Sequence, residues 1–307
     1  MKNQISALKS GDKVIILAPA KSIDEENVLY AKEFLSKKGY EVVVSEHCLG
    51  QHHYYSGTEL ERLTDFQNAL DDPGVKAIIC ARGGYGSVQI VDKIQWASFL
   101  RKPKWIAGFS DVTVFHQRIQ KLGHQSIHGT MPLNFKTNSK EAFASLLSAL
   151  KKEPYEIHAP FNEYNKFGSS NGMLVGGNLS ILYSLIGTND QIDYTDKILF
   201  IEDLAEQIYA IDRMFYALSK AGILDKIKGL IVGGMTNLSD TATPIGSNYQ
   251  EIILSHFQYK SIPICFDFPA GHIDDNQALV LGSHVSLNIG KNGTILNHSK
   301  HDEIILK

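Results

Sequence analysis

The stretch Trp105-Ile106-Ala107-Gly108-Phe109-Ser110-Asp111-Val112 decides the fold of the first half of this chain. A short apolar run predicts a buried strand, and a helical pattern follows at once over 112–122. Such a strand–turn–helix unit raises the hydroxyl of Ser110 above the end of a sheet and directs a helix N-terminus at it. The G-x-S-x-G elbow has this geometry, although Val112 replaces its second glycine. Ser110 is therefore a candidate nucleophile; the alternative is a helix cap, a role that Asp111 could also fill.

Working outward from this stretch, the first half alternates apolar runs with helical patterns. Repeated alternation of this kind predicts an open, doubly wound parallel sheet, because each crossover between parallel strands is right-handed. The expected domain is α/β, similar to flavodoxin or to class I amidotransferases. Strands are predicted over 14–19, 41–45, 76–80 and 105–108, and helices over 24–38, 58–70 and 112–122.

The pattern breaks after residue 160 in a polar segment rich in turn formers, which predicts a linker over 161–171. The expected domains are therefore 1–160 and 172–307. The second is predicted to be a mixed, sheet-rich α/β domain with several short strands near its end. Its helices are expected over 178–187 and 205–220, and its strands over 197–201, 228–233, 279–281, 285–288 and 294–296.

Composition narrows the classes of function. The chain has 307 residues and a net charge of −3, which provides no basic field for nucleic acid or an anionic membrane. No segment has the length and hydropathy of a signal peptide or a membrane span. Cys48, Cys80 and Cys265 are scattered, which favours free thiols in a reducing compartment. We therefore expect a soluble cytoplasmic protein.

A glycine-rich loop, Arg82-Gly83-Gly84-Tyr85-Gly86-Ser87, directly follows the predicted strand 76–80. It lacks the third glycine of a dinucleotide fingerprint, and no phosphate-binding G-x-x-x-x-G-K-[ST] motif occurs in the chain. An oxyanion hole suits the loop better, because the backbone N–H groups of Gly84 and Asp111 could converge on one developing negative charge. Arg82 could bind a substrate carboxylate or form a surface salt bridge.

A serine nucleophile needs a base, and the chain offers twelve histidines. His272 stands out because it follows Gly271 in a loop after an apolar run, although a merely hydrogen-bonded loop histidine has the same appearance. His116 could be structural. The pair His124 and His128 flanks a predicted strand rather than one helix face, so no metal site is expected. The remaining candidates lie in polar stretches and are expected to be solvated: His52, His53, His298 and His301.

The acid that orients the base is expected at the end of the strand 197–201, which runs into Glu202 and Asp203. Neighbours on a strand face opposite ways, so one carboxylate should lie at the sheet end, but spacing alone does not choose between them. A cap on the following helix is the alternative role, and it suits Asp203 and Glu206 better than Glu202.

Together these segments resemble the LD-carboxypeptidases, the muramoyltetrapeptide carboxypeptidase family of serine peptidases. The likeness spans nearly the whole chain in order, and the succession of motifs is more specific than any one of them. The motifs are the early Ile-Leu-Ala-Pro strand, Tyr55-Ser-Gly-Thr58 with Arg62, Arg82-Gly-Gly-Tyr-Gly86, Gly108-Phe-Ser-Asp111, His128-Gly-Thr-Met-Pro132, Gly176-Gly-Asn-Leu-Ser180 with Gly187-Thr188, Phe200-Ile-Glu-Asp203, Tyr209-Ala-Ile-Asp-Arg213 and Gly271-His272.

The resemblance implies a catalytic triad of Ser110, Glu202 and His272, and an oxyanion hole of the Gly84 and Asp111 amides. The implied substrate is a murein tetrapeptide that loses its terminal D-alanine during peptidoglycan recycling, without metal or cofactor. It also implies a homodimer. The alternatives are an amide hydrolase for microcin-like substrates with the same triad, and a ligand-binding protein with no catalytic activity.

Overall fold

The computed structural model describes residues 4–298, which divide into two compact units. The first unit contains the chain up to Glu153 together with Asp274–Val280, and the second contains Pro154–Ile273 and the residues from Leu281 onward. We describe each unit by itself. Both combine a sheet with helices, in agreement with the predicted α/β class.

The first unit is built on a six-stranded sheet in the order β11-β5-β4-β3-β1-β2. The pairs β1–β2, β1–β3, β3–β4 and β4–β5 are parallel, so the residues that follow these strands gather at one edge of the sheet. This confirms the predicted doubly wound sheet. Its strands are β1 (Lys13–Leu17), β2 (Glu41–Val44), β3 (Val75–Cys80), β4 (Trp105–Gly108), β5 (Ser126–His128) and β11 (Leu279–Leu281).

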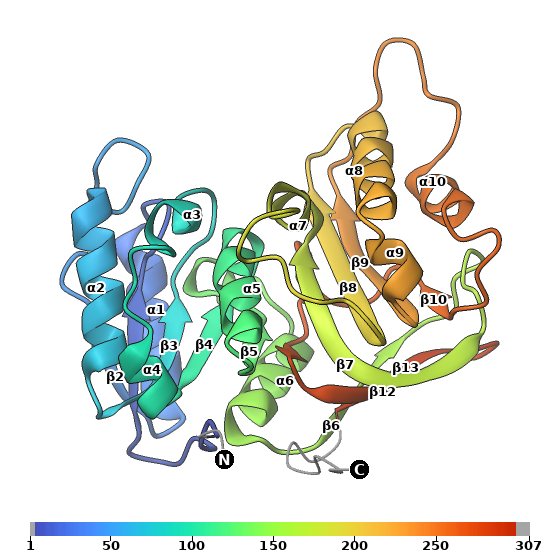
Figure 1. The fold of residues 1–307 in the computed structure, drawn as a ribbon. Helices are drawn as coiled ribbons and strands as arrows, with labels where there is room; N and C mark the ends of the chain where they lie inside the picture. Colours follow the sequence, from blue (N-terminus) through green and yellow to red (C-terminus); the bar gives the residue numbers. More distant parts are fainter. Residues whose placement is uncertain (1–3, 299–307) are drawn as a thin grey trace. The chain divides into compact units, whose positions relative to one another are not determined.

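Helices cover both faces of this sheet (Figure 1). Helix α1 (Glu25–Lys37) meets α6 (Lys140–Lys151) through Phe34 and Phe143, whose ring centroids lie 4.5 Å apart. Helix α2 (Glu59–Asp71) meets α5 (Thr113–Lys121) through Phe66 and Phe115, also 4.5 Å apart and stacked. The shorter helical segments are α3 (Ser87–Ile90), α4 (Ala97–Arg101), η1 (Ser110–Val112) and η2 (Pro132–Asn134).

The second unit is built on a seven-stranded sheet in the order β10-β9-β8-β7-β12-β13-β6. The pairs from β10 to β7 are parallel and those from β7 to β6 antiparallel. An apolar core of side chains from β7, β8, β9 and the helices buries the parallel part. The elements are β6 (Tyr155–Ala159), β7 (Gly168–Asn178), α7 (Leu179–Ser184), β8 (Lys197–Leu204), α8 (Ile208–Lys220), α9 (Ile223–Lys226), β9 (Gly229–Thr236), α10 (Tyr249–Ser255), β10 (Ile264–Cys265), β12 (His284–Gly290) and β13 (Gly293–His298).

The structure differs from the sequence-based boundaries in two places. The predicted linker 161–171 is in part strand, since β7 begins at Gly168 and pairs with β12 there. The segment 274–280 belongs to the first unit, where Ser139 donates its N–H to the Asp274 carbonyl (2.9 Å) and the Ala278 N–H donates to the Ser145 hydroxyl (2.8 Å). Pairing with distant β5 makes β11 part of the first sheet, which local sequence pattern does not reveal.

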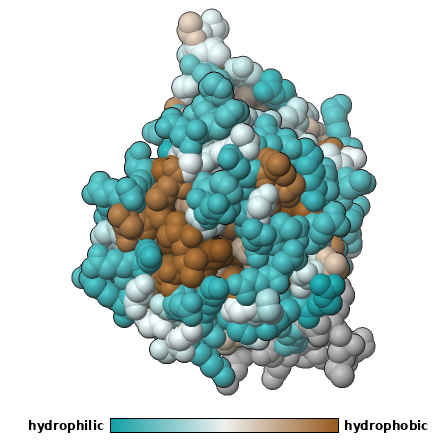
Figure 2. Space-filling view, turned by 90° about the vertical axis from the view of Figure 1, so that its left-hand side faces the viewer, coloured by the Kyte–Doolittle hydropathy of each residue, from teal (hydrophilic) through white to brown (hydrophobic). Residues whose placement is uncertain are grey.

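Strand β2 forms one edge of the first sheet, and its Val43 and Val44 are only half-buried. Figure 2 looks at the side on which α2 and β2 lie in Figure 1, and it shows an apolar area ringed by polar side chains.

None of the helices within residues 4–298 has the length and hydropathy to cross a membrane.

Candidate active site

The turn that carries Ser110 has a strained backbone. Ser110 has a φ of +64°, a left-handed conformation that is unusual for a residue with a side chain. It is separated by one residue from the end of β4, begins the short η1 helix and stays partly exposed. The N-cap residues of η1 and α5 are Phe109 and Val112, and neither makes a side-chain cap. The predicted strand–turn–helix unit is therefore present, and Ser110 is not the cap of the helix that follows.

The glycine-rich loop after β3 packs against this turn. A Cβ added at Gly83 would lie 3.0 Å from the Ser110 Cβ and 3.3 Å from the Asp111 nitrogen, so the loop backbone approaches the turn closely. Gly84 is exposed and has a φ of +102°. Its added Cβ would lie 2.8 Å from the Tyr54 hydroxyl and 2.9 Å from the Lys21 Cβ. Larger residues would thus displace the loop at both positions.

The side chain of Asp111 acts on the glycine-rich loop rather than on its own helix. Its Oδ2 accepts the N–H of Ser87 at 2.8 Å, at the start of α3. Burial raises the pKa of the Asp111 carboxyl, and the N–H of Ser87 opposes that rise. Asp111 therefore joins the turn that carries Ser110 to the loop that carries Gly84.

Arg82 is half-buried between these loops. Its NH1 donates to the Ser22 carbonyl at 3.0 Å, in the segment that follows β1. The contact is with a backbone carbonyl and not with a carboxylate, so the structure gives Arg82 a loop-bridging bond rather than the alternative surface salt bridge.

In the second unit, Glu202 and His272 are in direct contact. The imidazole Nδ1 lies 2.6 Å from Glu202 Oε2. The Glu202 side chain is fully buried, whereas that of His272 is 16% exposed. Burial lowers the pKa of His272, but the hydrogen bond and the charge of Glu202 outweigh it, so the pKa is raised overall. The pair has the geometry of an imidazole held in one tautomer by a buried carboxylate.

Two local features of the backbone place this pair. The register between β8 and β9 shifts between Ile201 and Asp203, and an irregularity of this kind re-aims the side chain at its centre, here Glu202. Gly271 has a φ of +109°, and an added Cβ would lie 2.7 Å from the Glu202 Cβ and 2.9 Å from its Oε2. Only glycine allows the loop to bring His272 this close to the carboxylate.

Asp203 has a different partner set. Its carboxylate accepts from the Asn178 side-chain amide (2.9 Å), the Ser180 N–H (2.8 Å) and the Leu204 N–H (2.8 Å). Burial raises its pKa to about 6. Asp203 therefore caps α7, which precedes β8, and not the helix after it; α8 has no side-chain cap at its N-terminus. The alternative role of Asp203 or Glu206 as a cap on the following helix is therefore not observed.

The other histidines differ from one another. His116 is buried, with Nε2 2.9 Å from the Gly108 carbonyl and Nδ1 2.8 Å from the Ser126 hydroxyl, and burial lowers its pKa to about 3. It is structural. His52 and His53 are exposed, as predicted. His298 is fully buried and stacks on Tyr155 at 4.6 Å, so its predicted solvation is wrong. His301 lies outside the described residues.

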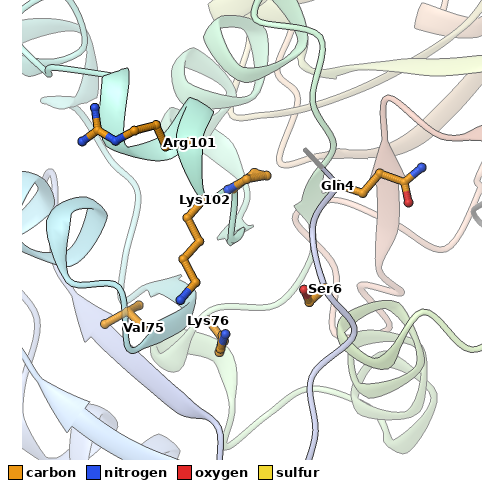
Figure 3. A pocket seen from close by; sticks show the side chains of 7 residues that line it. Gln4, Ser6, Val75, Lys76, Arg101 and Lys102 are labelled. Carbon is orange, nitrogen blue, oxygen red and sulfur yellow. The ribbon is translucent and has the colours of Figure 1, made fainter. Parts of the chain in front are cut away.

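A pocket of about 230 Å³ lies elsewhere on the first unit (Figure 3). Its lining includes the first two residues of β3 and the residues just before β4, at the amino ends of these strands, so it lies at the opposite edge of the sheet from Ser110. Within the part of the chain that the structure describes, no group of three or more His, Cys, Asp or Glu side chains is arranged to hold a metal ion. The lining residues are Gln4, Ser6, Val75, Lys76, Arg101, Lys102 and Pro103.

Comparison with known proteins agrees with this arrangement. Residues 14–129 match the LD-carboxypeptidase N-terminal domain and residues 171–287 match the LD-carboxypeptidase C-terminal domain, so Ser110 lies in the first match and Glu202 and His272 lie in the second. A probable murein peptide carboxypeptidase of Bacillus subtilis is 31% identical over 94% of this chain and 93% of its own length.

Two solved structures have the same fold. The muramoyltetrapeptide carboxypeptidase of Oxalobacter formigenes is 26% identical, with a TM-score of 0.85 over 93% of this chain and 98% of its own. MccF, solved in complex with glutamyl sulfamoyl guanosine, is 22% identical, with a TM-score of 0.86 over 97% and 99%, a likeness that shows the fold alone. The matches to both domain models, together with a relative above 30% identity across almost the whole chain, show that this protein belongs to the LD-carboxypeptidase family of serine peptidases.

Proposed function

We propose that this protein is a serine carboxypeptidase that hydrolyses the L,D-peptide bond before the terminal D-alanine of murein tetrapeptides. The observation that carries the proposal is the 2.6 Å contact between His272 and Glu202, a base and its orienting acid, in a family of serine peptidases. The strained turn at Ser110 supplies the third member of the proposed triad. The names of the relatives supply the substrate class.

In the proposed mechanism His272 Nε2 removes the proton from the Ser110 hydroxyl as its oxygen attacks the carbonyl carbon of the scissile bond. Glu202 holds the Nδ1–H and stabilises the imidazolium that forms. The N–H groups of Gly84 and Asp111 donate hydrogen bonds to the negatively charged oxygen of the tetrahedral intermediate. One such donor typically lowers the activation free energy by about 3 kcal/mol. The imidazolium then protonates the leaving amine of D-alanine, and water hydrolyses the acyl-enzyme by the same steps.

The direct experiment is incubation of the protein with disaccharide tetrapeptide, followed by mass analysis of the product for loss of one alanine. Ser110→Ala should lower kcat by roughly 10⁶-fold, as loss of a serine nucleophile does in a triad. Its melting temperature should stay close to that of the wild type, because Ser110 lies partly exposed at a turn. Turnover retained in Ser110→Ala would exclude it as the nucleophile.

A carboxypeptidase must bind the free carboxylate of its substrate, and we propose Arg82 for this role. It lies beside Gly83, and its planar guanidinium suits a carboxylate. Arg82→Gln should raise KM for the tetrapeptide, whereas the tetrapeptide C-terminal amide should be a poor substrate for both proteins. An unchanged KM would assign Arg82 only to the bond with Ser22.

An amide hydrolase for microcin-like substrates is the second candidate, favoured by the fold shared with MccF. Hydrolysis of an aminoacyl sulfamoyl nucleoside at a kcat/KM above that for the tetrapeptide would support it. A ligand-binding protein without catalysis is distinguished by a fluorophosphonate probe, which labels an activated serine and leaves a binder unmodified.

The proposal includes a cytoplasmic role in peptidoglycan recycling and a homodimer. The apolar area ringed by polar side chains in Figure 2 supports an interface, since exposed apolar patches of this kind often mark protein–protein contacts. Light scattering should give twice the chain mass in solution, and a monomeric mass would remove this part of the proposal. Accumulation of tetrapeptides in the cytoplasm of a deletion strain tests the role in recycling.

A further inference from the structure

Arg62 of α2 is a buried cation that touches the loops around the proposed nucleophile. It is 2% exposed, and its guanidinium lies 4.6 Å from the centre of the Tyr55 ring. Nε donates to the Gly57 carbonyl (3.3 Å), and NH2 donates to Gln89 Oε1 (2.6 Å). The NH1 group donates to two further carbonyls, those of Pro19 (2.8 Å) and Gly86 (3.0 Å). One side chain thus joins the segment after β1, the turn before α2 and the glycine-rich loop after β3.

The bond to Gly86 meets a second one on the same peptide unit. Gly86 supplies the carbonyl that Arg62 NH1 binds, and Ser87 supplies the N–H that the Asp111 carboxylate accepts at 2.8 Å. These two groups belong to the peptide that joins Gly86 to Ser87. The buried guanidinium therefore binds the negative, carbonyl end of the peptide dipole, and the buried carboxylate binds its positive, N–H end. Both bonds are charge-assisted, the stronger and more directional class of hydrogen bond.

We propose that the bridge from Arg62 through the Gly86–Ser87 peptide to Asp111 positions the backbone N–H of Gly84 for catalysis. The proposal rests on the function proposed above. Gly84 lies two residues before the clamped peptide, and Asp111 follows Ser110 directly, so the bridge fixes one oxyanion donor relative to the nucleophile and to the other donor. Arg62 acts through the loop and is a positioning residue, not a catalytic one.

Only arginine meets the geometry of this site. Four acceptors lie around its planar fork of N–H donors, and the face of the guanidinium lies against the Tyr55 ring. A lysine ammonium keeps the charge but cannot bind the Pro19, Gly57 and Gly86 carbonyls together. A misplacement of about 1 Å can cost roughly 10²-fold in rate. Arg62→Lys should therefore show a kinetic defect although the charge is unchanged.

The chain offers a matched control at the opposite edge of the same sheet. Lys104 is also 2% exposed, and its Nζ donates to the carbonyls of Ala69 (2.8 Å), Leu70 (3.0 Å) and Asp72 (2.8 Å). It lies just before β4, at the amino end of that strand. Lys104→Met removes a buried cation that binds several carbonyls, but it does so away from the Ser110 turn.

The experiment compares wild type, Arg62→Lys, Arg62→Met and Lys104→Met by kcat and KM on the disaccharide tetrapeptide. Arg62→Lys and Arg62→Met should lower kcat by about 10²-fold, with KM changed by less than about threefold, because the donor acts mainly in the transition state. Lys104→Met should lower the melting temperature and keep kcat within about twofold of wild type. Arg62→Lys and Arg62→Met kcat values equal to that of Lys104→Met would overturn the proposal.

Two further measurements keep the outcome decisive. Amide hydrogen exchange over 82–90 should be faster in Arg62→Lys than in wild type or Lys104→Met, and equal exchange in all three would reject the bridge. If Arg62→Met does not fold, a double-mutant cycle of Arg62→Lys and Asp111→Asn takes its place. Losses of kcat that multiply in the double variant would show that the two side chains act independently, which would contradict the bridge. A wild-type protein that releases no alanine rejects the proposed function, whereas the exchange experiment still tests the bridge.

Discussion

The imidazole of His272 and the carboxylate of Glu202 lie 2.6 Å apart although 70 positions separate them in the chain. The next residue, Asp203, is equally buried but has its carboxylate bound by Asn178, Ser180 and Leu204. Two adjacent carboxylates thus have separate partners: Glu202 contacts a histidine, and Asp203 contacts the N-terminal region of α7. This separation yields a sharp comparison between two conservative substitutions.

Glu202→Gln should lower kcat by about 10⁴-fold, the size of effect seen when the acid of a triad is replaced by its amide. The amide can present its NH2 to Nδ1 and so favours the wrong tautomer. Asp203→Asn should lower the melting temperature and reduce kcat far less, because its partners stabilise α7. Steady-state kinetics with thermal melting of both variants tests this assignment, and equal losses of kcat would contradict it.

The pH dependence of kcat/KM should report the His272–Glu202 contact. The base must be neutral to accept a proton, and Glu202 raises the pKa of His272 above its ordinary value of 6.5. The value of kcat/KM should therefore fall as the pH drops through an apparent pKa above 6.5 and reach its plateau on the alkaline side. In Glu202→Gln both raising effects of Glu202 are lost, and burial is opposed only by the smaller effect of the Asp203 charge, so the acid limb should move to lower pH. A wild-type limb below pH 6.5 would contradict the proposed base.

Local pattern was sufficient for much of the fold. The apolar runs at β1, β3 and β4 were identified because parallel strands buried on both faces are continuously apolar. The predicted helix 58–70 agrees with α2, and the structure shows that a Thr58–Glu61 capping box, a short-range interaction, marks its start. Strand β7 was partly misassigned as a linker, because its first half, Gly168-Ser-Ser-Asn-Gly172, is small and polar and owes its pairing with β12 to residues more than a hundred positions away.

The candidate site was less accessible from sequence. The turn motif identified Ser110, whereas spacing could not choose between Glu202 and Asp203, since the irregular register of β8 against β9 leaves both carboxylates buried. The contacts of Arg62 were missed because they join three loops that only tertiary structure brings together. The choice of Glu202 came from the family resemblance.

Gly271→Ala should damage the proposed site more than its backbone strain alone predicts. A left-handed alanine costs about 1–2 kcal/mol, and at Gly271 the new Cβ would also meet the Glu202 side chain at 2.7 Å. Gly222→Ala is the matched control, since its φ is +71° and nothing lies within 4 Å of an added Cβ. Both variants should lower the free energy of unfolding, and only Gly271→Ala should lower kcat. A similar kcat in the two would show that the close approach is not required.

The cluster of His47, Asp65 and Ser45 should make the stability of the first unit depend on pH. Asp65 accepts from His47 Nδ1 (2.8 Å), the His47 N–H (2.9 Å) and the Ser45 hydroxyl (2.6 Å), and the hydrogen bond to Asp65 raises the pKa of His47. A histidine whose pKa is raised by folding contributes stability that is fully present below its unfolded pKa and lost as the pH rises through the folded value.

His47→Asn should therefore lower the free energy of unfolding more at about pH 5.5 than at about pH 8.5. These two pH values lie below and above the ordinary pKa of histidine. The difference should be below about 1 kcal/mol, because the His47 side chain is 27% exposed and solvent screens the pair. Urea unfolding of wild type and variant at both pH values measures it. Asp65→Asn, introduced into both wild type and His47→Asn, is the control. Without the carboxylate, the substitution at His47 should have the same effect at the two pH values. If its effect still depends on pH, the pH dependence belongs to another group.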